Sequence, residues 1–280
     1  MAVYKQALES SFNLIDLYRT LKYKSDFDKR HPYFFHPCGT LIFSGDQGEG
    51  KTLSAAQYLV TVLNAYPFAV FVSNTKIKDR PFNAYYKVDK QNVGHIYDKK
   101  TKQEIKSQDI IDGKYQNVTI EYDGLDCLKY VNNGEYGVVY FIDEIHLELN
   151  SLESKNIDPD IMTELSQQRK QRKHIIGCSQ KFSRMAKPLR EQFDSVIVCS
   201  NYFGVFQINK LINHKKAHED NNGKLVAEVR KKWFFFHSPE MYTRYDTYEK
   251  MKRYNKEWKG SSKPQLELPV YVYNERSVKK

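Results

Sequence analysis

The chain has 280 residues, enough for one domain with a full core or for a domain and a half, and 40% of them are hydrophobic. Its formal net charge of +10 is typical of a protein with a polyanionic partner, nucleic acid or an anionic membrane surface, while a solvated lysine-rich surface is the alternative. The longest apolar runs are far shorter than the ~20 residues that cross a bilayer. The spacing of the four scattered cysteines excludes a zinc ribbon and indicates reduced thiols in a cytoplasm.

The first predicted element is a helix over residues 4–22, where apolar side chains recur at helical spacing. We favour a helix that packs on its own domain, with a helix that contacts another subunit or lies on a membrane surface as the alternative. Residues 31–37 contain two prolines, and we expect them to be extended because a residue before proline avoids helical backbone angles.

Residues 45–52 fit the pattern G-x-x-x-x-G-K-[ST] of a phosphate-binding loop. The loop lies between an apolar run at 40–44, which predicts a buried strand, and a predicted helix from 53 to near 64. We expect Lys51 to reach the β- and γ-phosphates and Thr52 to ligate Mg²⁺. The residues predicted to bind the nucleotide are Gly45, Asp46, Gln47, Gly48, Glu49, Gly50, Lys51, Thr52 and Leu53.

The middle of the chain predicts two short strands separated by a polar insertion. An apolar run at 67–74 indicates a second buried strand, and residues 118–122 indicate another. The lysine-rich residues 76–116 between them predict an exposed, mobile hairpin or loop. A brief helix near 126–131 and a turn at 132–134 complete this part.

Residues 138–142 form an apolar run that ends in Asp143 and Glu144, which is the Walker B pattern. A buried strand would deliver both carboxylates to the edge of the sheet where α/β proteins bind ligands. We expect Asp143 to hold Mg²⁺ through its water shell and Glu144 to act as the general base on water. An ordinary strand that ends in an acidic turn is the alternative.

A further helix is predicted to begin with Asp158 as its N-cap and Pro159 at its first position, and to end in a basic run at 169–174. The basic end is either a solvated helix terminus or a contact to phosphates or a neighbouring subunit. The following strand, 175–180, ends in Gln180 and is expected between the strands of the phosphate loop and of Asp143. This order would place Gln180 beside the γ-phosphate, where an amide can both donate and accept.

The remaining residues predict the end of the sheet and an extension. A short helix is expected from Pro188, and a strand at 195–199 is expected to close the central sheet. Alternating residues at 205–211 and 224–229, with Asn-Asn-Gly at 221–223 between them, predict a β-hairpin. Residues 237–280 are rich in Tyr, Lys and Arg, and we expect them to be partly irregular, with a basic helix at 250–259.

Five features follow one another along the chain, which are the phosphate loop, the Asp143-Glu144 pair, the basic lead-in 172–174, Gln180 and Arg190. In this order of features the chain resembles the zonular occludens toxin (Zot)-like ATPases of filamentous and tailless phages, which are similar to the FtsK–HerA branch of P-loop motors. The resemblance covers about residues 38–200, with a weaker match at 242–248. It implies a RecA-like α/β fold with a central, mostly parallel sheet flanked by helices. It also implies that Gln180 senses the γ-phosphate and that Arg190, or else Arg184, is an arginine finger.

These inferences predict an ATP-hydrolysing motor that translocates or packages viral or plasmid DNA, working with Mg²⁺ as a homo-oligomeric ring, a hexamer. Its expected place is the host cytoplasm, peripheral to a membrane or attached to a virion, with capsid, portal or membrane assembly proteins as further partners. The expected domains are a lead-in at 1–37, an ATPase core at 38–203 and a β-hairpin extension at 204–280. An assembly switch that binds ATP without moving DNA is the main alternative, and the Asp143-Glu144 pair with Gln180 argues against a metabolic kinase.

Overall fold

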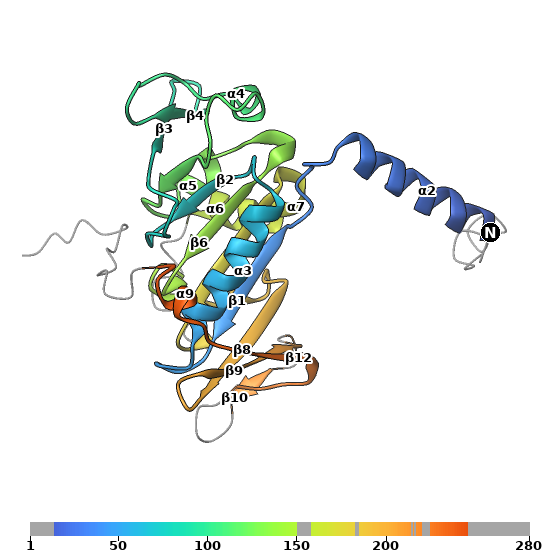
Figure 1. The fold of residues 1–280 in the computed structure, drawn as a ribbon, viewed down its shortest axis with the longest axis vertical. Coiled ribbons are helices and arrows are strands. Elements are labelled where there is room, and N and C mark those ends of the chain that lie inside the picture. The colour runs from blue at the N-terminus through green and yellow to red at the C-terminus, as the bar shows by residue number, and fades with distance from the viewer. Residues whose placement is uncertain are drawn as a thin grey trace, which may run out of the picture.

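The structure is a computed structural model that describes residues 14–149, 158–182, 185–213, 215, 217–219 and 225–245. Within these residues, ten strands form one mostly parallel sheet with helices on both faces, which confirms the predicted fold class (Figure 1). From one edge to the other the strands are β12 (Val229–Phe236), β9 (Phe206–Ile212), β8 (Ser195–Tyr202), β1 (Gly39–Ser44), β7 (Lys173–Ser179), β6 (Val138–Ile142), β2 (Val70–Ser73), β5 (Thr119–Glu121), β3 (Ala84–Val88) and β4 (Gly94–Asp98).

The helices and a small second sheet complete the described elements. The helices are α2 (Leu14–Arg30), α3 (Lys51–Ala65), α4 (Ser107–Ile111), α5 (Cys127–Tyr130), η1 (Gly134–Tyr136), η2 (Ile145–Leu147), α6 (Pro159–Ser166), α7 (Gln168–Gln171), α8 (Lys187–Arg190) and α9 (Pro239–Tyr242). The small sheet pairs β10 (His218–Glu219) with β11 (Leu225–Val226). None of the described helices is long and apolar enough to cross a membrane.

The central strands are buried on both faces, as is usual for parallel sheets covered by helices. In β6, Val139 and Phe141 contact the core beneath α3, whereas Val138, Tyr140 and Ile142 contact the core on the opposite face. That second core also contains side chains from α5, α6 and α8. The sheet and the helices on its two faces therefore form three layers, which support the loops at the ends of the strands.

The carboxyl ends of β1, β7 and β6 meet at one edge of the sheet. β7 pairs in parallel with β1 on one side and with β6 on the other, so its predicted position is confirmed. The register places Ser44 opposite Ser179 and Ile142 opposite Gly177. The phosphate loop, Gln180 and the Asp143-Glu144 pair follow these three strands directly. They therefore lie together at the carboxyl ends of the central strands.

The N-terminal helix differs from the predicted one. The described part, α2, continues to Arg30, beyond the expected end at residue 22, and none of its residues is buried. It projects away from the body of the protein (Figure 1). The prediction that this helix packs on its own domain is therefore wrong for its described part. An apolar stripe predicts a helix but does not indicate which surface covers it. Residues 4–13 lie outside the described part.

The sheet also continues further than predicted. β8 does not close it, because β9 pairs antiparallel with β8 and β12 pairs antiparallel with β9. The predicted pairing of 205–211 with 224–229 is wrong, since the partner of β9 is mainly residues 231–236 and the small β10–β11 sheet occupies the connection. At the other edge the polar insertion forms the β3–β4 hairpin, attached through β5. The expected turn at 221–223 and helix at 250–259 lie outside the described residues.

Candidate active site

The phosphate loop is held in shape by β8 and by β9, the first strand of the C-terminal extension. The Glu49 carboxylate accepts a hydrogen bond from the backbone N–H of Asn201 at 2.6 Å. The Gln207 side chain donates to the Glu49 carbonyl at 3.0 Å and is itself fully buried. Gly50 is required here, because its φ is 71° and a Cβ atom would lie 2.1 Å from the Gln207 Oε1. The loop is thus supported by β8 and β9 as well as by its own glycines.

Lys51 begins α3 immediately after this loop. Its side chain is only 7% exposed, and its Nζ donates to the Asp46 carbonyl at 2.9 Å. The first N–H groups of a helix have no partner within the helix, and they favour anions together with the helix dipole. The loop, the helix start and the lysine therefore have the arrangement expected of a site for phosphate groups, and in this structure the lysine is held by a neutral carbonyl.

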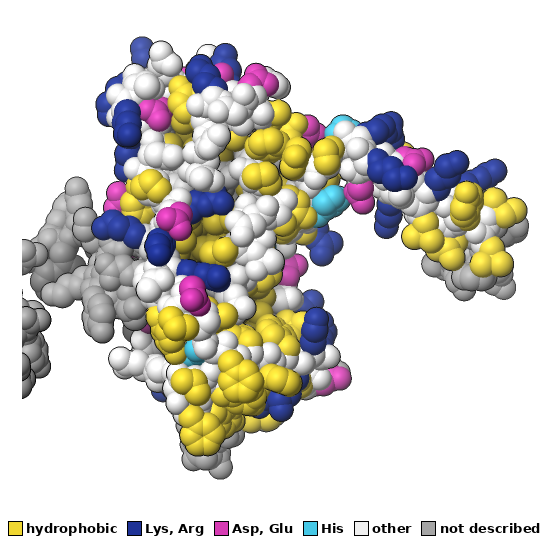
Figure 2. Space-filling model, viewed as in Figure 1, with side chains coloured by type: hydrophobic (Ala, Val, Ile, Leu, Met, Phe, Trp, Pro, Cys, Tyr) yellow, Lys and Arg dark blue, Asp and Glu magenta, His cyan; other side chains and the backbone are white. Residues whose placement is uncertain are grey.

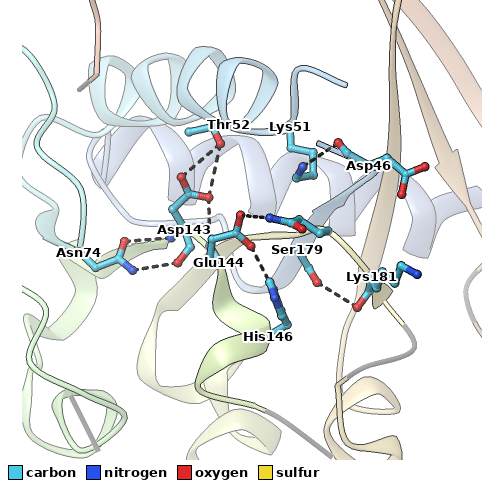
Figure 3. A network of polar contacts seen from close by, with 10 residues as sticks. Asp46, Lys51, Thr52, Asn74, Asp143, Glu144, His146, Ser179 and Lys181 are labelled. Carbon is cyan, nitrogen blue, oxygen red and sulfur yellow. Dashed lines mark hydrogen bonds and ion pairs between the residues drawn. The ribbon is translucent and has the colours of Figure 1, made fainter. Parts of the chain in front are cut away.

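Asp143 lies between Thr52 and Asn74 (Figure 3). The Thr52 hydroxyl lies 3.2 and 3.4 Å from the two Asp143 carboxylate oxygens. Burial raises the pKa of Asp143, and the adjacent Glu144 charge raises it further. A bound cation would relieve both effects, because it favours the charged form of the carboxylate.

Glu144 has one carboxylate oxygen hydrogen-bonded to Gln180 and the other beside His146. Its φ of 52° is in the left-handed region, which turns the residue away from the direction of β6. Gln180 donates from its Nε2 to Glu144 Oε1 at 2.8 Å, and His146 Nδ1 lies 3.1 Å from Glu144 Oε2. The structure therefore brings together the predicted base and the predicted sensor amide. It also places His146 beside Glu144 (Figure 3).

Two groups at the site were not among the predicted residues. Asn74 follows β2, and its amide donates to the Asp143 carbonyl and accepts from the Asp143 N–H, both at 2.9 Å. On β9, Asn209 accepts from Ser54 and from Gln207 at 3.2 Å each. Asn74 could have been found as a polar residue at the end of a buried strand. The β9 amides gave no such signal, because only the antiparallel extension brings them beneath the loop.

The basic lead-in has a different role from the predicted one. Arg172 ends α7 with φ at 55°, and the sheet begins at once with Lys173 and His174, which are 2% and 4% exposed. Lys173 ion-pairs with Glu164 at 2.9 Å and also donates to a backbone carbonyl, while His174 Nδ1 contacts the Gly39 carbonyl at 3.0 Å. The predicted solvated helix end or phosphate contact is therefore wrong for Lys173 and His174. Both side chains are buried, and they join β7 to the helices α5 and α6 and to β1.

Arg190 lies in α8, outside the cluster around Asp143. Its guanidinium carbon is 5.5 Å from the centre of the Phe182 ring. Among the described residues, no ion pair joins it to Glu191 or Asp194, the surface partners that would make it a structural residue. Asp194 instead accepts from the Thr40 N–H at 2.9 Å. Arg184, the other finger candidate, is not among the described residues.

The weaker match at 242–248 lies close to the site as far as it is described. The backbone N–H of Lys78 donates to the Arg244 carbonyl at 2.7 Å, and Tyr245 pairs with Ile77 as an isolated bridge. Tyr245 packs against the core beneath α3, and burial raises its pKa to about 12. The C-terminal segment is therefore anchored beside the end of β2.

The oxygen ligands at the site fit Mg²⁺ better than a transition metal. Across the described ranges, no group of three or more His, Cys, Asp and Glu side chains is placed to hold a metal. Mg²⁺ does not need one, since it keeps several waters and is held by one or two protein oxygens together with substrate phosphates. The Thr52 hydroxyl beside the buried Asp143 carboxylate supplies such oxygens.

A family model described as zonular occludens toxin (Zot) matches residues 39–247. Among solved structures, the chain is similar to the N-terminal domain of zonular occludens toxin from Neisseria meningitidis, with 12% identity and a TM-score of 0.45 over 75% of this chain and 100% of that chain. It is similar to the genome packaging NTPase B204 from Sulfolobus turreted icosahedral virus 2, with 15% identity and a TM-score of 0.38 over 60% and 76%. It is also similar to the flagellar accessory protein FlaH from Methanocaldococcus jannaschii, with 13% identity and a TM-score of 0.35 over 66% and 83%. No curated protein matches the chain.

Proposed function

The chain belongs to the zonular occludens toxin (Zot) family, and we propose that it is an ATP-hydrolysing motor that translocates or packages viral or plasmid DNA during phage assembly. The observation that carries this proposal is the meeting of five side chains at one edge of the sheet. These are Lys51, Thr52, Asp143, Glu144 and Gln180. A site that only bound nucleotide would have no need of a carboxylate held beside a polar sensor.

The nucleotide phosphates would bind to the loop 45–52 and the first turn of α3. Lys51 would exchange the neutral Asp46 carbonyl for phosphate oxygens, a charge-assisted contact about twice as strong as a neutral one. Thr52 and Asp143 would hold Mg²⁺, directly and through water. When bound, the ion would neutralise phosphate charge and orient the phosphates for in-line attack.

Glu144 would take the proton from the attacking water. In the structure its Oε1 accepts a hydrogen bond from Gln180, and its Oε2 lies 3.1 Å from His146 Nδ1. An amide that donates to Glu144 in one state can donate to a γ-phosphate oxygen in another, so arrival of ATP would release the carboxylate toward water. Gln180 would thereby couple the presence of the γ-phosphate to the freedom of the base.

We place the motor in a homo-oligomeric ring, in which Arg190 of one subunit serves the site of the next. Its guanidinium lies on an aromatic ring and not in the cluster of its own chain. An arginine brought to a neighbour's γ-phosphate stabilises the transferring charge and contributes roughly 10³–10⁵ in rate. The excess of positive charge suits DNA as the polymer. Such a motor would meet capsid, portal or membrane assembly proteins in the host cytoplasm, at a membrane surface or on a virion.

The test is ATP hydrolysis by the full chain with and without DNA. A motor should hydrolyse ATP faster with DNA, and the stimulation should decline as salt releases the polymer. Hydrolysis that DNA leaves unchanged, together with ATP-dependent binding of assembly proteins, would move the assignment to the assembly switch.

A further inference from the structure

The β3–β4 hairpin lies at the sheet edge opposite β12 (Figure 1). Two of its tyrosines stack on each other. Tyr85 and Tyr97 face each other in the register, with ring centroids 5.6 Å apart and planes inclined by 23°. The neighbouring pair, Tyr86 and Ile96, contacts the core on the other side. With three lysines, the two half-buried tyrosines line an open hollow of about 780 Å³.

Two of the three lysines of this hollow lie over the tyrosine rings. Lys87 Nζ is 5.6 Å from the centre of the Tyr85 ring and 6.0 Å from that of Tyr97, and Lys102 Nζ is 5.2 Å from that of Tyr85. No ion pair found among the described residues includes Lys87 or Lys102, whereas Lys99 reaches Glu121 only at 4.0 Å. Lys and Arg side chains gather over this end of the molecule in Figure 2.

The acidic side chains of the hairpin are used to build it. Asp89 accepts from two backbone N–H groups of the β3–β4 turn, at 2.8 and 2.9 Å, and also contacts His95. Glu104 lies 2.8 Å from the other ring nitrogen of His95, and Asp98 accepts from two N–H groups of the next turn. These carboxylates are therefore bonded to the hairpin's own turns and to His95, and within the described residues none of them forms an ion pair with a lysine of the hollow.

We propose that this hollow binds single-stranded DNA, with bases stacked on Tyr85 and Tyr97 and phosphates bound by Lys87 and Lys102. Aromatic rings beside unpaired cations are the combination that binds single strands, since every base offers a flat face and every nucleotide a negative charge. A duplex keeps its bases within its own stack and offers only phosphates. The inference rests on the proposed function in taking DNA as the polymer.

The test compares two double variants that remove the same charge. Lys87→Ser/Lys102→Ser removes two of the three lysines that line the hollow, and Lys231→Ser/Lys232→Ser removes two exposed lysines from β12 at the opposite edge. Binding of a labelled oligothymidylate is measured without nucleotide across a salt series. The hairpin variant should bind more weakly than the control, with a salt slope smaller in magnitude by about 1.4, because each phosphate contact on a single strand contributes about 0.7.

Stacking is tested separately with Tyr85→Leu, which keeps an apolar side chain in the strand. Its affinity for oligothymidylate should fall by about 5- to 150-fold, while its affinity for an abasic strand of equal length stays unchanged. Thermal unfolding of each variant establishes that it is folded, and the lysine variants decide the matter if Tyr85→Leu is not.

Several results would overturn the site. One such result is an equal loss of affinity in the two lysine variants, and another is an equal loss for Tyr85→Leu on strands with and without bases. The other two are binding of oligouridylate but not of oligothymidylate, and a hairpin-dependent affinity for phosphatidylserine vesicles but not for DNA. The binding assay contains no ATP, so its failure is separable from that of the motor. A hairpin that binds DNA in a protein that never hydrolyses ATP would keep this inference and reject the proposed function.

Discussion

Asn74 offers a direct test of how the acidic pair is held, because its amide contacts the backbone of Asp143 on both sides. Asn74→Ala removes two hydrogen bonds of 2.9 Å. At about 0.5–1.5 kcal/mol each, the two bonds together contribute about 1–3 kcal/mol. If they orient Asp143 and Glu144 for reaction, that free energy is lost in the transition state and kcat should fall by about 5- to 150-fold.

The matched control is Asn83→Ala. Asn83 bridges backbone groups in the same way, accepting from the Thr119 N–H at 2.8 Å and donating to the carbonyls of Gln116 and Asn117, but it lies beside β5 and away from the site. Both variants should lose a similar free energy of unfolding in urea. Steady-state ATP hydrolysis should fall in Asn74→Ala alone. An equal fall in both, or full activity of a folded Asn74→Ala, would refute the reasoning that this amide positions the acids.

Three further predictions concern the loop, the core and the subunit contact. Lys51→Ala should abolish ATP binding in calorimetry while the circular dichroism spectrum is unchanged. Burial lowers the pKa of His174, so below about pH 6.5 the unfolded chain binds a proton that the folded chain does not. The free energy of unfolding should therefore fall by up to about 1.4 kcal/mol per pH unit as the pH is lowered. Measured by urea unfolding, this pH dependence should be smaller in His174→Gln than in His36→Gln, a control at an exposed histidine. Mixing inactive Arg190→Ala with inactive Lys51→Ala should restore part of the ATPase activity if the arginine acts between subunits, and mixed rings that stay inactive would contradict that assignment.

The phosphate loop and the acidic pair could be predicted because each is a short local pattern set by a strand and its turn. The place of β7 between β1 and β6 followed from the same class of site, and the structure has that order. His146 could not be predicted in this way, because it is a single polar residue whose partner, Glu144, lies on a left-handed turn. Asn74 carried a weaker signal, as a polar residue at the end of a buried strand, but the sequence does not indicate that its partner is Asp143, 69 residues away.

The errors came where tertiary contacts outweighed local character. Lys173 and His174 have the composition of a basic helix end, but the left-handed Arg172 ends the helix and both side chains find buried partners. The hairpin of the extension was assigned to the wrong second strand, because an alternating pattern does not say which of two following strands pairs with β9. In the same way, the apolar residues of α2 predicted a helix and left open whether its own body covers it.

The central claim is that Glu144 is the base of an ATP-hydrolysing site, and Glu144→Gln tests it most directly. Glutamine keeps the shape of the side chain and can still meet Gln180 and His146, but it cannot take a proton from water. ATP binding should persist while single-turnover hydrolysis falls by roughly 10²–10⁴-fold. Hydrolysis at the wild-type rate in a folded Glu144→Gln protein would contradict the account.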